Sequence, residues 1–394
     1  MGLLKKIALF SACLVFVFLF SARVSRAQTV NSVSGTVANG NNVTVNGSGF
    51  GVKNPVAPYK YDSFQTGSNG QAVSTTASGG VAWNYFSSCA SGGIMTPETG
   101  FRYSNANPRF SGDISGWKFY GYNTNHDCYQ GTNYLTLNKS DGFDEVYWSM
   151  WLLSETNGQN AKVRNVKIAN WNYNETNYPQ GRWDFYPTQG SGSGHVYALS
   201  CGSENSNEWG VGASAFSYGA ETWNRFEGSL VVGNPGVANG RYEVYKNSSL
   251  LQTTGNVMIR NTESCHKPDT FFFTHYHDDI DTSYSPPAPE QNLYHGEIYV
   301  DITRARVEVC DSSTWGSRSH CEIQIPHTTW NNGQIQITVN QGTFSSGQTA
   351  YLFVVNANGN VSNGYPITIG SGGTTPPPLP SCPNCCSTTQ TCPT

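Results

Sequence analysis

The segments Trp223–Val232 (WNRFEGSLVV) and Arg241–Lys246 (RYEVYK) decide the fold, because both alternate large apolar residues with polar or charged ones. Successive side chains of a β-strand point to opposite faces of the sheet, so strict alternation predicts a strand with one buried face. The Asn/Gly/Pro-rich stretch between the two segments favours a turn. We therefore expect each of the two segments to form a β-strand.

The same alternation recurs along the chain, and no long amphipathic helical pattern occurs. Charged residues make up only 12% of the sequence, whereas Gly (42), Tyr (22), Phe (19) and Trp (10) are abundant. This composition suits short strands and tight turns, and it excludes a coiled coil, a basic nucleic-acid-binding protein and a charged disordered chain. We expect an all-β protein, with further strands at 146–153, 162–168, 182–186, 271–277, 297–302, 334–339 and 350–355.

The N-terminal segment predicts export. Lys5 and Lys6 precede the apolar run Ile7–Phe20, and the small residues of Ser25–Ala27 suit signal peptidase, so residues 1–27 are interpreted as a signal peptide. The alternative is a membrane anchor, but the run is shorter than the ~20 residues that cross a bilayer, and no second such run follows. The expected product is a secreted protein with 18 basic and 26 acidic side chains.

Export also determines how the cysteines are interpreted. Removal of Cys13 leaves an even number, ten, which favours disulfides in an oxidising compartment. Cys310 and Cys321, which flank a polar stretch between two strand-like segments, are the expected pair. Two further bridges would link Cys89, Cys128, Cys201 and Cys265 in an undetermined pattern. The group Cys382, Cys385, Cys386 and Cys392 could form two bridges or, alternatively, bind zinc.

Both ends of the chain carry parts of one motif. Val33–Val37 (VSGTV) and Asn42–Gly51 (NVTVNGSGFG) resemble the start of an IPT/TIG immunoglobulin-like domain, and Ala350–Val355 with Asn358–Gly364 look like its end. The resemblance implies one discontinuous Ig-like β-sandwich, residues 28–52 plus 303–370, interrupted by an insertion. Two unrelated end modules are the alternative.

The inserted segment, residues 53–302, also carries a recognisable pattern. Tyr61–Phe64, Val146–Leu152, Trp223–Glu227 with Asn239–Lys246, and Gly296–Asp301 follow each other as in the concanavalin A-like lectin/glucanase jelly roll, which several polysaccharide lyases share. The resemblance implies a jelly-roll β-sandwich that recognises glycans. After the second part of the Ig-like domain, residues 371–394 are interpreted as a disordered Pro/Cys-rich tail. Within it, Thr374–Pro380 (TTPPPLP) is interpreted as a polyproline spacer.

Alternation within the jelly-roll strands predicts a polar and aromatic face suited to an acidic sugar. β-Elimination of a uronic-acid polymer needs a cation or amide that neutralises the carboxylate, and a base that removes the C5 proton. The expected catalytic residues are Arg182, His195, Tyr197, Arg225 and His275, and the expected substrate-binding residues are Asp184, Tyr186, Glu227 and His277. For Arg225 with Glu227, an ordinary cross-strand ion pair is the alternative.

Metal binding is less clearly indicated. His275 and His277 share a strand face, but no third ligand is fixed by the sequence, so the pair could equally be sugar-binding or part of a solvated loop. Asp141, Asp144 and Glu145 could hold calcium, and the sequence establishes no cofactor with certainty. The ExDxxE pair of retaining glucanases, GxSxG and HExxH are absent from the sequence. We expect a polysaccharide-directed protein, either a lyase or, alternatively, a non-catalytic adhesin or matrix protein whose tail attaches to a surface.

Overall fold

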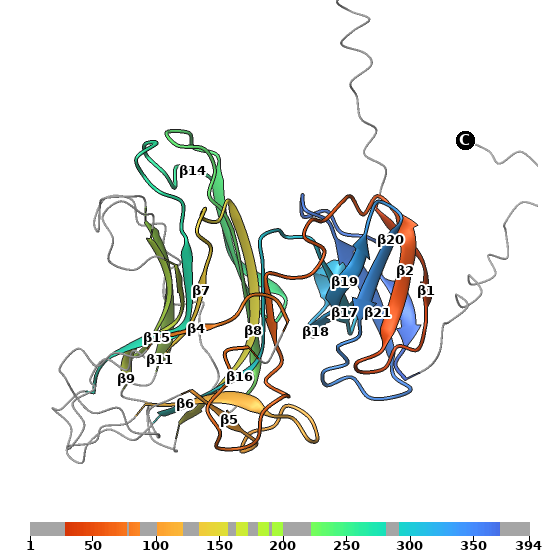
Figure 1. Ribbon diagram of the computed structural model, residues 1–394, viewed down its shortest axis with the longest axis horizontal. Coiled ribbons are helices and arrows are strands. Elements are labelled where there is room, and N and C mark those ends of the chain that lie inside the picture. Colours follow the sequence, from red (N-terminus) through yellow and green to blue (C-terminus); the bar gives the residue numbers. More distant parts are fainter. Residues whose placement is uncertain are drawn as a thin grey trace, which may run out of the picture.

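The computed structural model is almost entirely β, as the alternation predicts (Figure 1). It describes the backbone of residues 28–76, 79–86, 101–120, 134–156, 163–171, 180–188, 191–199, 222–280 and 291–370. Side chains at 85–86, 117–120, 134, 154–156, 163–168, 170, 180–188, 191–199, 274–280 and 291 are outside this description. The described part contains one short 3₁₀ helix, η3 (Trp315–Ser317), and no helix in it is long and apolar enough to cross a membrane.

The larger sandwich consists of two antiparallel sheets. The eight-stranded sheet has the order β14-β13-β12-β8-β16-β6-β5, with β3 also paired to β16. Its strands are β3 (Lys60–Asp62), β5 (Arg102–Ser104), β6 (Ser115–Tyr120), β8 (Glu145–Thr156), β12 (Asn224–Val231), β13 (Gly240–Lys246), β14 (Ser249–Val257) and β16 (Gln291–Asp301).

The second sheet of this sandwich is six-stranded and has the order β11-β10-β9-β15-β7-β4. Figure 1 shows the two sheets curving together as stacked layers. The strands are β4 (Asn84–Phe86), β7 (Tyr134–Asn138), β9 (Val163–Trp171), β10 (Gln180–Thr188), β11 (Ser191–Leu199) and β15 (Thr270–Ile280).

One apolar core fills the space between these two sheets. Alternate residues of β8, among them Trp148 and Met150, point inward and are buried against Phe271 and Phe273 of β15. Trp171 of β9 meets Tyr242 of β13 across the same space, with ring centroids 5.2 Å apart. These aromatic side chains account for much of the apolar area removed from water, and their packing fixes which face of each strand is outermost.

The smaller sandwich is built from both ends of the chain (Figure 1, red beside blue). Asn42 pairs with Thr338, so an N-terminal strand is hydrogen-bonded to one near the C-terminus. The two sheets have the orders β1-β2-β20-β19 and β18-β17-β21-β22. Their strands are β1 (Thr29–Ser34), β2 (Asn42–Ser48), β17 (Arg306–Cys310), β18 (Cys321–Ile323), β19 (Ile325–Trp330), β20 (Gln334–Thr338), β21 (Thr349–Val355) and β22 (Tyr365–Thr368).

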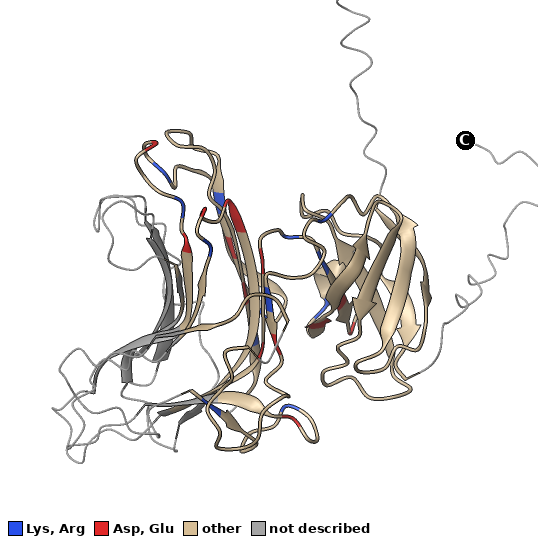
Figure 2. Cartoon of the chain, viewed as in Figure 1, with Lys and Arg blue, Asp and Glu red and all other residues tan. Residues whose placement is uncertain are grey.

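The smaller sandwich packs on the outer face of the eight-stranded sheet. Tyr147 and Tyr299 of that sheet form a small buried cluster with Ile323 of β18. Figure 2 shows basic and acidic residues gathered on the eight-stranded sheet and on the strands of the smaller sandwich that face it. Strands β1, β2 and β20, on the far side of the smaller sandwich, carry almost no charged residues. The two sandwiches therefore meet through a charged interface.

Candidate functional site

Most of the predicted site residues lie on β10 and β11, two adjacent strands of the six-stranded sheet. In the register of this antiparallel pair, Arg182 is opposite Tyr197, and Asp184 is opposite His195. Tyr186 is opposite Ser193 in the same pair. The backbone thus brings five of the nine predicted positions onto two neighbouring strands, while their side chains lie outside the described residues.

The two histidine positions lie on β15 of the same sheet. β9 separates β15 from β10, and it pairs with both. Lys167 of β9 is opposite Asp184 on one side and Tyr276 on the other, so Tyr276, which lies between His275 and His277 in the chain, is level with Asp184. The side chains of His275 and His277 lie outside the described residues, and so does any metal site that would include them.

Arg225 and Glu227 do not belong with these residues, which corrects their expected place in a substrate groove. Both side chains are 1% exposed and lie on β12, on the face of the eight-stranded sheet that the smaller sandwich covers. The alternation rule placed them together correctly, since Arg225 Nη2 lies 3.2 Å from Glu227 Oε1. What it could not indicate is that another part of the chain packs on this face.

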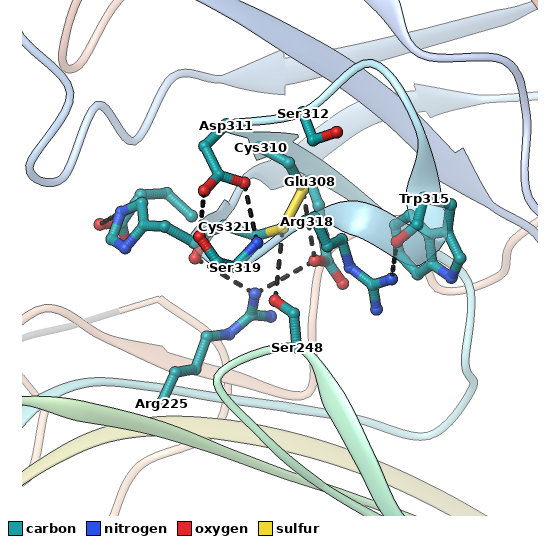
Figure 3. Close-up of a disulfide and its surroundings, with 12 residues drawn as sticks. Arg225, Ser248, Glu308, Cys310, Asp311, Ser312, Trp315, Arg318, Ser319 and Cys321 are labelled. Atoms are coloured by element: carbon teal, nitrogen blue, oxygen red, sulfur yellow. Dashed lines mark hydrogen bonds and ion pairs between the residues drawn. A yellow bond between two sulfur atoms is a disulfide. The ribbon is translucent and has the colours of Figure 1, made fainter.

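The guanidinium of Arg225 joins the two sandwiches (Figure 3). Its Nη1 donates to Glu308 Oε2 (3.1 Å) and to the carbonyl oxygen of Cys321 (3.2 Å), and its Nε donates to Ser149 Oγ (2.8 Å). Burial alone would raise the pKa of the Glu308 carboxyl, but the guanidinium groups of Arg225 and Arg306 beside it hold this pKa well below its usual range. The group is therefore an ionised, hydrogen-bonded network, and its chemistry is structural.

The Cys310–Cys321 disulfide lies beside this network and confirms the predicted pair. It joins β17 to β18 at directly opposite positions, and both cysteines are completely buried. Ser248, from the turn after β13, donates to Cys321 Sγ across the interface (3.5 Å) (Figure 3). Cys265 is also disulfide-bonded, whereas the four tail cysteines lie outside the described residues.

A second buried cluster, which the sequence did not indicate, surrounds Arg109. Arg109 Nη2 donates to Glu322 Oε1 of β18 at 2.6 Å, and its guanidinium stacks on Trp151, 4.3 Å from the ring centroid. Burial and the nearby Glu322 raise the pKa of the Glu297 carboxyl to about 8. Glu322 itself has a pKa lowered to about 2, because Arg109 and His320 outweigh the effect of burial. No sequence signal pairs these residues, since Arg109, Trp151, Glu297 and Glu322 come from four separate segments of the chain.

The chain crosses from one sandwich to the other near Lys53 and again near Asp301, and a buried ion pair joins these two crossings. Lys53 Nζ lies 2.9 Å from Asp301 Oδ2, and both side chains are fully buried. The same ammonium donates to the carbonyl oxygens of Pro55, Val56 and Ala57. Four oxygen atoms therefore surround one charge, which fixes both passages of the chain relative to each other.

The three candidate calcium ligands are not gathered at one point. Asp141 pairs with Lys139, Asp144 pairs with Lys267, and Glu145 Oε1 accepts a hydrogen bond from the backbone N–H of Arg304. Within the described residues, the one group of metal-ligating side chains is Glu308 with the two disulfide-bonded cysteines beside it. Arginine side chains neutralise this glutamate, so it is not a cation site.

Comparison with known proteins gave structural likenesses at low sequence identity. No protein-family model matches the sequence, and no curated protein matches it. The PL-14 alginate lyase of Aplysia kurodai is 14% identical, over 52% of this chain and 88% of the lyase, with a TM-score of 0.38. The endo-β-1,4-glucuronan lyase of Trichoderma reesei is 11% identical, over 55% and 94% of the two chains, with a TM-score of 0.39. The cellulose-induced protein Cip1 is 16% identical, over 62% and 97%, with a TM-score of 0.37. At these identities and TM-scores, the likeness assigns neither an activity nor a site.

Proposed function

We propose that the chain is a secreted, carbohydrate-directed protein whose six-stranded sheet binds an acidic polysaccharide and cleaves it by β-elimination. The observation that carries this proposal is the register of β10 and β11, in which Arg182 is opposite Tyr197 and Asp184 is opposite His195. Directly opposite residues of an antiparallel pair share one face of the sheet. A cation, a phenol and an imidazole are the groups that the reaction needs.

The arrangement of the two sandwiches supports the choice of this sheet. The outer face of the eight-stranded sheet is closed, because residues such as Tyr147, Glu227 and Tyr299 are buried there against the smaller sandwich. In the part of the larger sandwich that the structure describes, the smaller sandwich covers the eight-stranded sheet, so we assign a polymeric substrate to the outer face of the six-stranded sheet. In the proposed reaction, Arg182 neutralises the uronate carboxylate, and Tyr197 or His195 removes the C5 proton. The bond from C4 to the glycosidic oxygen breaks as the C4–C5 double bond forms, and the conjugate acid of the base or a water molecule protonates the leaving oxygen.

The proposal includes the organisation of the chain. Residues 1–27 would be removed on export, residues 28–52 and 303–370 would form one Ig-like domain of IPT/TIG type, and residues 53–302 would be the jelly roll inserted into it. The pairing of β2 with β20 supports this division. N-terminal sequencing of the exported protein tests the first step, and Gln28 is the residue expected at the new N-terminus.

The activity is tested by incubating the mature protein with alginate, glucuronan and pectin while following the ultraviolet absorbance of the unsaturated product. We expect Tyr197→Phe and His195→Ala to lower the rate, and loss of the base lowers it by about 10²–10⁴-fold. Tyr351→Phe, which removes a tyrosine hydroxyl from β21 of the smaller sandwich, is the matched control and should leave the rate unchanged.

Two results would overturn the enzymatic part of the proposal. One is the absence of unsaturated product on all three polymers. The other is a rate that neither the Tyr197 nor the His195 variant changes. Glycan binding retained without any product would instead support the alternative, a non-catalytic adhesin or matrix protein.

A further inference from the structure

The buried ion pair between the two crossings of the chain has a lysine as its cation. Lys53 Nζ lies 2.9 Å from Asp301 Oδ2, and both side chains are fully buried. Every other ion pair of the described residues in which both side chains are buried has an arginine as its cation. A guanidinium stays protonated and is not a nucleophile, whereas the amine of a desolvated lysine is one. Among these buried pairs, only Lys53 and Asp301 have side chains that can condense to an amide.

The carboxyl group of Asp301 is held at both of its oxygen atoms. Oδ2, which lies beside Lys53, also accepts a hydrogen bond from the Tyr299 hydroxyl group at 2.8 Å. Oδ1 accepts a hydrogen bond from the backbone N–H of Ile302, also at 2.8 Å. This N–H can stabilise negative charge on Oδ1 when an amine adds to the carboxyl carbon, and the phenol can donate a proton to Oδ2 as it leaves.

Burial favours the neutral forms of both side chains, which are the forms that react. It lowers the pKa of the Lys53 ammonium group and raises the pKa of Asp301 to about 6, although each charge opposes the shift of the other. Glu145 is a further acid that interacts with Asp301, and burial raises its pKa to about 7. When a proton moves from the ammonium to the carboxylate, an amine lies beside a carboxylic acid in a place that bulk water does not reach.

We propose that Lys53 and Asp301 form an intramolecular isopeptide bond between the two crossings of the chain. The amine nitrogen forms a bond to the carboxyl carbon of Asp301, and the bond from this carbon to Oδ2 breaks. Of the three ammonium protons, one stays on the amide nitrogen and two leave with Oδ2 as one water molecule. One neutral amide replaces two buried charges and thereby removes the cost of keeping both out of water. The inference is independent of the proposed function.

The hydrogen bonds that Lys53 gives up lie close to solvent. Its Nζ donates to the carbonyl oxygens of Pro55, Val56 and Ala57, and the nearest of these is the oxygen of Val56, at 2.6 Å. The amide N–H can keep one of the three acceptors. Pro55 and Ala57 are exposed residues, so water can hydrogen-bond to the oxygens that lose their donor. The released water molecule can leave on the same side.

The isopeptide bond makes a closed ring of the larger sandwich. The strands of this sandwich run from β3 to β16, and the bond joins Lys53, which precedes β3, to Asp301, the last residue of β16. A cross-link restricts the unfolded chain, and in the chain-entropy model the stabilisation grows with the length of the loop that it closes. The two crossings therefore stay joined even when the strands between them unfold.

The test is mass spectrometry of the mature wild-type protein after denaturation and reduction of the disulfides. We expect the mass deficit relative to the sequence to exceed that of Lys53→Arg by one water molecule, because this variant keeps the positive charge but cannot condense. Trypsin cleaves after a free lysine and not after an amide-bonded one. The wild-type digest should therefore contain a branched peptide that joins the segment around Lys53 to the segment around Asp301. Lys267→Arg is the matched control, because Lys267 pairs with Asp144, at 2.8 Å, in a pair open to solvent, and this variant should keep the branched peptide.

The wild-type digest decides the question even if Lys53→Arg folds poorly. The proposal fails if Lys53 and Asp301 are recovered in separate linear peptides and no branched peptide is present. It also fails if the wild type and Lys53→Arg differ from their sequence masses by the same amount.

Discussion

Replacing Arg225 by methionine is the sharpest test of its assignment to the interface. The substitution keeps most of the apolar stem and removes the guanidinium that contacts Glu308, Glu227, Ser149 and the Cys321 carbonyl group. If Arg225 were a substrate-binding residue, its loss would lower activity and leave stability largely unchanged. If it joins the sandwiches, the main effect is on the free energy of unfolding.

The expected magnitude follows from the groups that lose their partner. Glu308 keeps Arg306, whose Nε lies 2.5 Å from Oε1. Among the described residues, the hydrogen-bond donor left to Glu227 is the Tyr147 hydroxyl group, at 2.6 Å. Removing one partner of a buried ion pair costs about 3–5 kcal/mol, because the other charge remains buried without compensation. We therefore expect Arg225→Met to lower the free energy of unfolding by about 4 kcal/mol.

The assay is reversible urea unfolding at pH 7, followed by tryptophan fluorescence. Arg241→Met is the control, because Arg241 is 35% exposed and lies 3.6 Å from Glu243, and such a surface pair contributes about 1 kcal/mol or less. The reasoning is refuted if Arg225→Met costs less than about 1 kcal/mol, the level of an exposed pair. Loss of the proposed lyase activity at unchanged stability would restore Arg225 to the substrate site.

Three further predictions concern the core and the interface. Removing the disulfide with Cys310→Ala and Cys321→Ala, which lie 11 residues apart, should cost about 3 kcal/mol in urea unfolding, and an unchanged midpoint would contradict this. Lys53→Met should lower the free energy of unfolding by about 3–5 kcal/mol at pH 8 and by less at pH 5. Burial raises the pKa of Asp301 to about 6, so acid protonates the carboxylate that has lost its lysine partner. An equal loss at both pH values would show that this carboxylate is not the cause. Gly228→Ala should lower the free energy of unfolding by about 1–3 kcal/mol, measured by calorimetry, because a Cβ there would lie 2.4 Å from the indole of Trp148 on the neighbouring strand. Unchanged stability would mean that the core rearranges to make room for the methyl group.

The strands could be predicted well because alternation is a local property. The segment Arg241–Lys246 becomes β13 (Gly240–Lys246), and Trp223–Val232 becomes β12 (Asn224–Val231), with Phe226 and Leu230 in the core as their spacing requires. The Cys310–Cys321 pair was also predictable, because its two strands are adjacent in the sequence.

The interface could not be predicted, because it depends on which segment packs on the outer face of a sheet. Alternation places Arg225, Glu227 and Tyr147 on one side of the sheet. The sequence pattern of such a charged outer face is the same whether water, a glycan or another sandwich covers it. The contact of Arg109 with Glu322 joins positions that are 213 residues apart in the chain. Only the three-dimensional docking of the sandwiches brings such residues together.

The pairing of β2 with β20 has a consequence for how the protein is made. Asn42 meets Thr338 in this pair, 296 residues later in the chain, so the first hairpin leaves the ribosome long before its partner strands exist. Until then β2 presents an open edge, and a contact of such long range adds to the time that folding needs. We expect the smaller sandwich to close last, and the growing chain to depend on whatever protects that edge in the meantime.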